Sequence, residues 1–229
     1  NLPGSFMIND SNKKISEKNF SRKDFKLPEK SFVYCCFNNF YKITPDVFDI
    51  WMKLLKKNEQ SILWLSQGND LIVKNLRKEA TLRNIEPSRI VFSKKLPLLS
   101  DHLARISLAD LFLDTFPYNA HATCSDALWS GLPLITKIGN SFSGRVAASM
   151  LNAVGLPELI TKTDNEYEEL ALYLSKNKDQ LKKIKNKLKI NRFTTSLFDT
   201  KAYVKNIENA YIKVHNRYTE NLLPENIDV

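Results

Sequence analysis

The feature that most constrains this chain is a repeated alternation of short apolar segments with amphipathic segments of helical spacing. Residues 32–37 form a continuous apolar and aromatic run, which is typical of a buried parallel strand. After a short loop, Thr44 suits a helix N-cap and Pro45 the first helical position. The apolar stripe of the helix that follows consists of Val47, Trp51, Leu54 and Leu55. Together these segments predict one strand-helix unit.

The same unit recurs along the chain. The expected pairs of strand and helix are 61–65 with 70–84, 89–92 with 100–105, 111–114 with 123–130, 134–136 with 145–154, and 158–160 with a helix from 165. Thr163 and Glu166 form a capping-box pattern at the start of the last of these helices. Six alternations imply an open parallel sheet with helices on both faces. We therefore predict an α/β fold with a doubly wound, Rossmann-like parallel sheet, followed by helices over 179–192 and 200–218.

The chain divides into three parts by composition. Residues 1–30 are polar and irregular and contain Pro3, Gly4 and Pro28, so we interpret them as a linker from a preceding lobe. Residues 31–195 form the predicted Rossmann-like domain, and residues 196–229 form a C-terminal helix and tail. The absence of a methionine at Asn1 suggests a fragment of a longer protein.

Charge and cysteine content limit the setting of the protein. The formal net charge is +9, with many of the lysines between residues 176 and 192 at the spacing of a solvated helix face, and no aromatic residues or RNA-module motifs accompany them, so nucleic-acid binding is not favoured. No apolar run is long enough to span a membrane. Three cysteines are an odd number, and Cys35 and Cys36 are adjacent. We therefore expect a reducing, cytoplasmic location.

Ligands of doubly wound sheets bind at the carboxyl ends of the strands, so the loops there are the candidate site. The stretch 114–123 places an imidazole at His121, a hydroxyl at Thr123 and free backbone N–H groups at a helix start, which favours a phosphate group. Lys42, in the loop after the first strand, supplies a charge that could neutralise a departing diphosphate. The local pattern leaves simpler interpretations open, in which Thr123 caps its helix with Asp126 as capping partner, His121 is structural and Lys42 is a surface lysine.

Several common signatures do not occur. The sequence has no G-x-G-x-x-G and no G-x-x-x-x-G-K-[ST], which argues against the usual dinucleotide and P-loop sites. It also has no C-x-x-C, H-E-x-x-H or Asp-x-Asp pattern, so we expect no metal and no cofactor.

The loops and strands together match a known family. The matching segments are 32–43 (FVYCCFNNFYKI), 61–65 (SILWL), 89–93 (RIVFS), 101–105 (DHLAR), 108–114 (LADLFLD), 119–121 (NAH), 126–133 (DALWSGLP) and 145–149 (RVAAS). In this string the chain resembles the C-terminal catalytic lobe of the O-linked N-acetylglucosaminyltransferase family and its Spindly-like relatives, from about residue 30 to 212. The resemblance implies the C-terminal, nucleotide-sugar-binding half of a GT-B glycosyltransferase. It also implies an inverting enzyme that moves N-acetylglucosamine from UDP-N-acetylglucosamine to serine or threonine hydroxyls of proteins.

The resemblance also implies residue roles. Lys42 corresponds to the lysine that stabilises the UDP leaving group, and Asp126 to the acid that takes ribose hydroxyls. The segment of His121, Ala122 and Thr123 corresponds to the one that holds the diphosphate. The other matched site residues are Asn39 beside the phosphates, and Leu96, His102 and Arg105 on the uracil and ribose side.

Three departures from the family pattern affect these roles. Asn39 stands where animal enzymes carry glutamine, and Ala122 stands where threonine is common. The loop 97–102 is one residue longer than expected, with Leu98 and Leu99 near the position of a ribose-contacting lysine. Of the three departures, the last affects the roles assigned to base and sugar recognition most.

The resemblance further implies parts that lie outside this chain. These are a first lobe with an active-site histidine and the tetratricopeptide repeats that recruit protein acceptors, so we expect the chain alone to bind nucleotide weakly and to transfer little. Two alternatives stay open from the sequence. One is a GDP-fucose-dependent transferase of the same fold, and the other is a non-catalytic module that binds anions or nucleic acid through the basic helix near Lys183.

Overall fold

The computed structural model describes residues 1–229 and contains one sheet of six parallel strands. The strands are β1 (Phe32–Cys36), β2 (Ser61–Ser66), β3 (Ile90–Ser93), β4 (Leu111–Leu113), β5 (Leu134–Lys137) and β6 (Ile160–Thr161). Their order is β3-β2-β1-β4-β5-β6, and every neighbouring pair is parallel. The chain thus runs outward from β1 to β3 and then crosses back to place β4 beside β1. This confirms the predicted doubly wound α/β fold.

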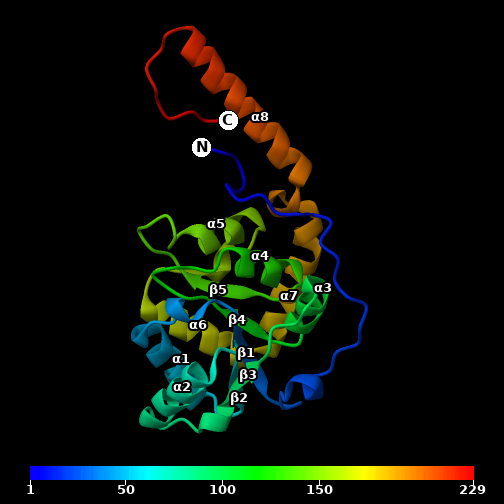
Figure 1. The fold of residues 1–229 in the computed structure, drawn as a ribbon, viewed down its shortest axis with the longest axis vertical. Helices are drawn as coiled ribbons and strands as arrows, with labels where there is room; N and C mark the ends of the chain where they lie inside the picture. Colours follow the sequence, from blue (N-terminus) through cyan, green and yellow to red (C-terminus); the bar gives the residue numbers. More distant parts are fainter.

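Helices cover the sheet and continue beyond it (Figure 1). They are α1 (Pro45–Lys57), α2 (Asp70–Leu82), α3 (Leu99–Ile106), α4 (Ala122–Trp129), α5 (Val146–Ala153), α6 (Asp164–Lys176), α7 (Lys178–Thr194) and α8 (Thr200–Thr219). Short 3-10 turns lie at Arg22–Phe25, Phe40–Lys42, Pro87–Arg89, Pro157–Leu159 and Ser196–Phe198. Helix α6 packs beside α1, and α4 contacts both α3 and α5, so the helices form layers against the sheet.

The core is built on the central strands. Cys35 of β1 lies opposite Trp64 of β2 and Phe112 of β4, and all three side chains are fully buried. This accounts for the continuous apolar run that the sequence shows, because a parallel strand between two neighbours buries both of its faces. All three cysteines are buried and free of disulfides.

The capping residues behave largely as predicted. The Thr44 hydroxyl accepts the Val47 N–H, with Pro45 beginning α1. Thr163 likewise accepts the Glu166 N–H at 3.1 Å, but the Glu166 carboxylate accepts the N–H of Lys162 rather than that of Thr163. In the predicted capping box, the Glu166 carboxylate therefore accepts an N–H group one residue before the expected N-cap residue.

One strand prediction was misplaced. Residues 158–160 were expected as the sixth strand, whereas Pro157–Leu159 form a 3-10 turn and β6 covers only Ile160–Thr161. The proline fixes φ and lacks an N–H group for the ladder, which favours a turn at this position.

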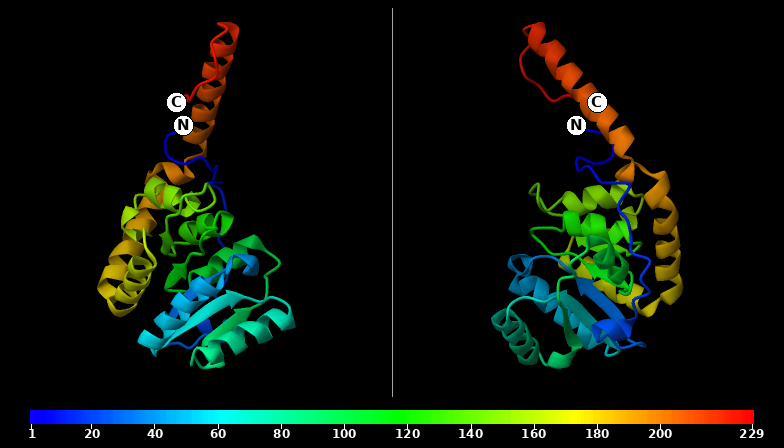
Figure 2. Two further views of the ribbon diagram at one scale, coloured as in Figure 1. Left: turned by 90° about the vertical axis from the view of Figure 1, so that its left-hand side faces the viewer. Right: turned by 45° about the vertical axis from the view of Figure 1, so that its right-hand side comes forward.

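The two ends of the chain lie together, away from the sheet. Helix α8 extends from the domain, has no buried residue and exposes Tyr211 and Tyr218, and both termini lie beside it (Figure 1). The N-terminal segment runs along the outside of the domain (Figure 2). None of the helices has the length and apolar character needed to cross a membrane.

Candidate functional site

The strand order brings two of the candidate loops together. Strands β1 and β4 are neighbours although 77 residues of chain separate the paired positions Cys35 and Phe112. The order reverses between them, and this is the place where ligands of doubly wound sheets bind, outside the carboxyl ends of the strands. The loop after β1 carries Lys42, and the loop after β4 carries His121.

The start of α4 is open to a ligand. His121 is the N-cap residue, with φ −112° and ψ −93°, and its side chain makes no capping hydrogen bond. The backbone N–H groups of Ala122 and Thr123 have no acceptor within the chain. Free N–H groups and the positive end of the helix dipole together favour the binding of an anion at this position.

Thr123 does not cap the helix. Its hydroxyl donates to Oδ1 of Asn38, a buried residue in the loop after β1. Asp126 does not close a capping box either, since its carboxylate pairs with Lys13. The interpretation of these two residues as simple helix caps is therefore wrong.

Lys42 is not a surface lysine. The residue is 8% exposed, and Nζ donates to the Asn119 carbonyl at 2.8 Å. The same atom lies 3.8 Å from the centroid of the Tyr118 ring, which in turn lies 5.1 Å from the centroid of the His121 ring. Burial lowers the pKa of Lys42, with the negative groups around it opposing this shift. The ammonium has three donors, so the bond to Asn119 leaves others for a ligand.

The pKa of His121 is affected by burial and by the nearby Lys42. Its pKa is lowered first by burial and also by the charge of Lys42, while a contact with the Ser143 carbonyl raises it. The ring nitrogen Nε2 lies 3.4 Å from that carbonyl. The neutral imidazole is thus the favoured form, held between Tyr118 and the loop before α5.

A buried carboxylate supports both loops. Oδ1 of Asp114, at the end of β4, accepts the N–H groups of Thr115 and Ala120 at 2.7 and 2.6 Å, and Oδ2 accepts the Thr136 hydroxyl at 2.6 Å. Burial raises the pKa of Asp114 to about 7, and these hydrogen bonds oppose the shift. The carboxylate therefore fixes the path of the chain just before His121.

A cavity of about 540 Å³ adjoins this cluster through Asn38, and of the remaining predicted site residues only Asp126 does not line it. Four of the predicted residues line it: Asn39, Leu96, His102 and Arg105. Residues from the ends of β1, β2 and β3 complete the wall, namely Phe37, Asn38, Phe40, Ser66, Gln67, Lys95, Pro97 and Leu99. The structure thus places the second group of predicted residues in one hollow at the same edge of the sheet.

The polar groups of this cavity are held by the protein. Arg105 is 2% exposed and donates to the Lys94 carbonyl at 2.6 Å and to Nδ1 of His102 at 3.0 Å. Burial lowers the pKa of Arg105 to about 10, so it stays charged at neutral pH. Burial, followed by the charge of Arg105, lowers the pKa of His102 to about 4. The His102 ring packs edge-on against Phe37, with centroids 5.4 Å apart, and is neutral at physiological pH.

Four residues that the sequence interpretation did not select take part in the site. Asn38 and Tyr118 lie within the candidate loops, and Asp114 is an acidic residue at a strand end, so all three carry a weak signal in the sequence. Lys13 lies in the irregular N-terminal segment and carried none, because its partner Asp126 is 113 residues away in the chain.

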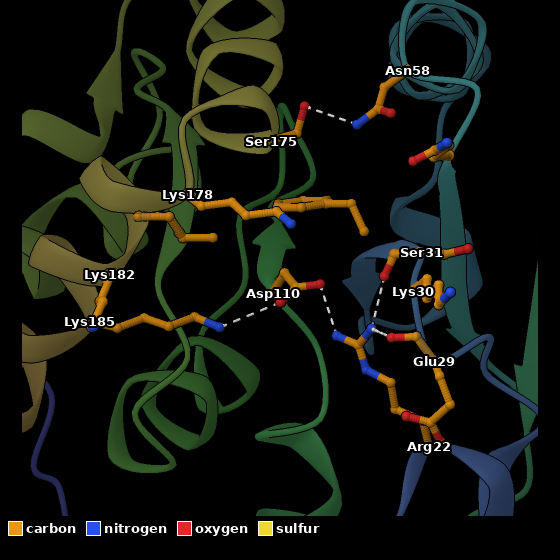
Figure 3. Close-up of a pocket in the computed structure, with 13 residues that line it drawn as sticks. Arg22, Glu29, Lys30, Ser31, Asn58, Asp110, Ser175, Lys178, Lys182 and Lys185 are labelled. Carbon is orange, nitrogen blue, oxygen red and sulfur yellow. Dashed lines mark hydrogen bonds and ion pairs between the residues drawn. The ribbon is translucent and has the colours of Figure 1, made fainter.

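Figure 3 shows a second cavity, of about 650 Å³, where the chain enters β1, β2 and β4. Its basic lining is partly neutralised, because Arg22 and Lys185 approach the Asp110 carboxylate at 2.9 and 3.6 Å. The sequence predicts that the lysines of residues 176–192 lie on a solvated helix face. The prediction is confirmed for Lys183 and Lys189, which are exposed, but not for Lys185, whose pKa is lowered by burial. The cavity lies at the amino ends of the strands, opposite the switch point, so it is not the candidate donor site.

Comparison with solved structures defines the class of protein. WaaG, a glycosyltransferase of lipopolysaccharide biosynthesis, superposes with a TM-score of 0.61 over 90% of this chain and 55% of its own, at 15% identity, which shows the fold. A mutant of the Thermobaculum terrenum O-GlcNAc transferase superposes with a TM-score of 0.76 at 30% identity, over 80% of this chain and 36% of its own. The fold is thus the Rossmann-like C-terminal lobe of GT-B glycosyltransferases.

Sequence comparison defines the family. The model of glycosyl transferase family 41 matches residues 11–207, and the chain belongs to this family. A UDP-N-acetylglucosamine–peptide N-acetylglucosaminyltransferase of Caenorhabditis elegans is 39% identical over 86% of this chain. The SEC protein of Arabidopsis thaliana, described as a probable enzyme of the same kind, is 35% identical over the whole chain. The chain spans 17% and 24% of the lengths of these two relatives, respectively.

Proposed function

We propose that this chain is the donor-binding lobe of an inverting glycosyltransferase that transfers N-acetylglucosamine from UDP-N-acetylglucosamine to serine or threonine hydroxyls of proteins. Its family membership and the activity named for its relatives support the donor and the acceptor. The single observation that carries the proposal is the meeting of the Lys42 ammonium with the open N-terminus of α4 at the switch point.

The chemistry assigned to this place is charge compensation. Displacement at the anomeric carbon releases a diphosphate, and a pre-organised ammonium with free N–H groups stabilises the charge that develops. Lys42 stabilises the negative charge of the leaving diphosphate. His121, Ala122 and Thr123 hold the diphosphate oxygens, and Asn39 lies beside these oxygens. No metal enters this proposal, because the Lys42 ammonium and the free N–H groups supply the positive charge at this place.

The base and sugar of the nucleotide belong in the adjoining cavity. Its volume and its position next to Asn38 support this placement, since Asn38 lines the cavity and also bonds Thr123. Leu96 contributes its backbone, His102 and Arg105 line the uracil side, and Asp126 takes ribose hydroxyls.

The rest of the reaction is assigned to parts of the protein beyond this chain. The relatives are four or more times as long, which supports an N-terminal catalytic lobe and tetratricopeptide repeats that bring the protein acceptor. Three free, buried cysteines support a reducing cytoplasmic location.

Calorimetric titration of the 229-residue chain tests the proposal. UDP and UDP-N-acetylglucosamine are expected to bind more tightly than GDP, and His121→Ala should weaken UDP binding on the order of tenfold, because a group beside the diphosphate is lost. Lys189→Ala, on the exposed face of α7, serves as a control and should leave the affinity unchanged. Preference for GDP would instead favour the fucosyl donor, and salt-sensitive RNA binding without nucleotide binding would favour the anion-binding module.

A further inference from the structure

The N-terminal segment is attached to α3, to α4 and to the turn before α8. The Asn9 side chain donates to the Leu197 carbonyl at 3.1 Å, and the Ser16 N–H donates to the Ser100 carbonyl at 3.1 Å. Between these points the Lys13 carbonyl accepts the indole N–H of Trp129 at 2.9 Å. Residues 9–18, here called the strap, thus cross from the start of α8 over α4 to α3 (Figure 2).

Lys13 turns from the strap toward the site. Its Nζ lies 2.8 Å from Oδ1 of Asp126 and 3.4 Å from the Ser125 hydroxyl. The side chains of Lys13 and Asp126 are only 18% and 15% exposed, so the pair is largely withdrawn from water. Oδ2 of Asp126 has no hydrogen-bond partner within the chain, and its carboxylate opposes the lowering of the pKa of His102 in the neighbouring helix α3.

We propose that Lys13 is a positioning residue of the nucleotide site, which holds the Asp126 carboxylate so that its free oxygen accepts a ribose hydroxyl. The inference rests on the proposed function, because that function supplies the ribose. The strap is therefore a structural part of the donor site rather than a passive linker.

Two physical arguments support this role. A carboxylate bonded through one oxygen has a restricted orientation, and a restricted acceptor loses less entropy when it binds a hydroxyl. A carboxylate near a diphosphate also repels it, and the ammonium of Lys13 makes the pair neutral. The hydrogen bond from the Trp129 indole to the Lys13 carbonyl fixes the position of the Lys13 backbone, so the long Lys13 side chain reaches a defined place.

The test compares UDP with 2′,3′-dideoxy-UDP, which keeps the base and diphosphate but lacks both ribose hydroxyls. Wild-type chain should prefer UDP about tenfold, the order expected when a charged acceptor loses its donor. In Lys13→Met this preference should fall to about twofold, because Asp126 is no longer held. Lys13→Arg should restore most of the preference, and Lys14→Met, an exposed neighbour in the strap, should keep it.

Each result separates the inference from the function on which it rests. Absence of UDP binding by the wild type would overturn the proposed function and the role of Lys13 together. The proposed function stands if the wild type binds UDP and His121→Ala weakens that binding. In that case, only the role of Lys13 fails if Lys13→Met retains the tenfold preference or binds UDP more tightly than the wild type. Thermal unfolding and the tryptophan fluorescence of the variant, to which Trp129 contributes with Trp51 and Trp64, check that the strap stays attached. The main-chain bond to the Trp129 indole is not removed by this substitution.

Discussion

The two ends of the candidate donor site are built on different principles. At the start of α4, the candidate groups are a buried ammonium and N–H groups without acceptors in the chain. In the adjoining cavity, the charge of Arg105 is already bonded to the Lys94 carbonyl and to His102, and the imidazole is neutral. The first end is suited to recognise charge and the second to recognise shape and hydrogen-bonding edges. The comparison predicts that substitutions at the two ends change phosphate affinity and base affinity independently.

The largest effect is expected from Lys42→Met. UDP affinity should fall on the order of tenfold to a hundredfold, because the variant removes a buried charge beside the diphosphate. Affinity for uridine, which has no phosphate, should change less than about twofold, since the cavity is left intact. Calorimetry with both ligands measures the difference.

Lys53→Met, on the exposed side of α1, is the matched control and should change neither affinity. A similar loss of uridine affinity in Lys42→Met would show that the two ends are not independent.

A smaller effect, of a different kind, is expected from Arg105→Met. The change leaves the Lys94 carbonyl and His102 without their donor, so the cavity wall loosens. UDP and uridine affinity should fall by the same factor, on the order of threefold to tenfold, and the free energy of unfolding by about 1–3 kcal/mol. Calorimetry and urea unfolding measure the two quantities. A loss confined to UDP would mean that Arg105 serves the phosphates, and the comparison would break.

The smallest net effect concerns pH, because the contributions of His102 and Asp114 to stability have opposite signs and partly cancel. His102 titrates near 4 in the folded chain and near 6.5 when unfolded, so between these values only the unfolded state binds the proton and stability falls as pH falls. Asp114 titrates near 7 when folded and near 3.8 when unfolded, so in that window the folded state holds the proton and stability rises as pH falls.

Thermal unfolding between pH 4 and 7 measures both contributions. His102→Gln should reduce the loss of stability toward acid pH, and Asp114→Asn should make that loss steeper. Equal pH profiles for the two variants would contradict the assigned shifts. Uridine affinity should stay constant between pH 6 and 8, because His102 is neutral throughout.

The comparison between sequence and structure is instructive at particular residues. The strand at 32–36 and the helix capped by Thr44 could be predicted because burial and capping leave local patterns of residue type. The last strand could not be placed correctly, since a two-residue strand is too short to produce a periodicity. Thr123 was ambiguous for a similar reason, because a hydroxyl at a helix start has the same local pattern whether it caps the helix or bonds a distant amide.

The sequence by itself determined the class of fold and the residue types available at the carboxyl edge, because alternation of apolar and amphipathic segments depends on neighbours a few positions apart. The tertiary structure decided that the loops after β1 and β4 meet, that Lys42 is buried against Tyr118, and that Lys13 pairs with Asp126. These contacts follow from strand order and from the path of the N-terminal segment. Neither leaves a local trace, since the partners are separated by more than seventy residues of chain.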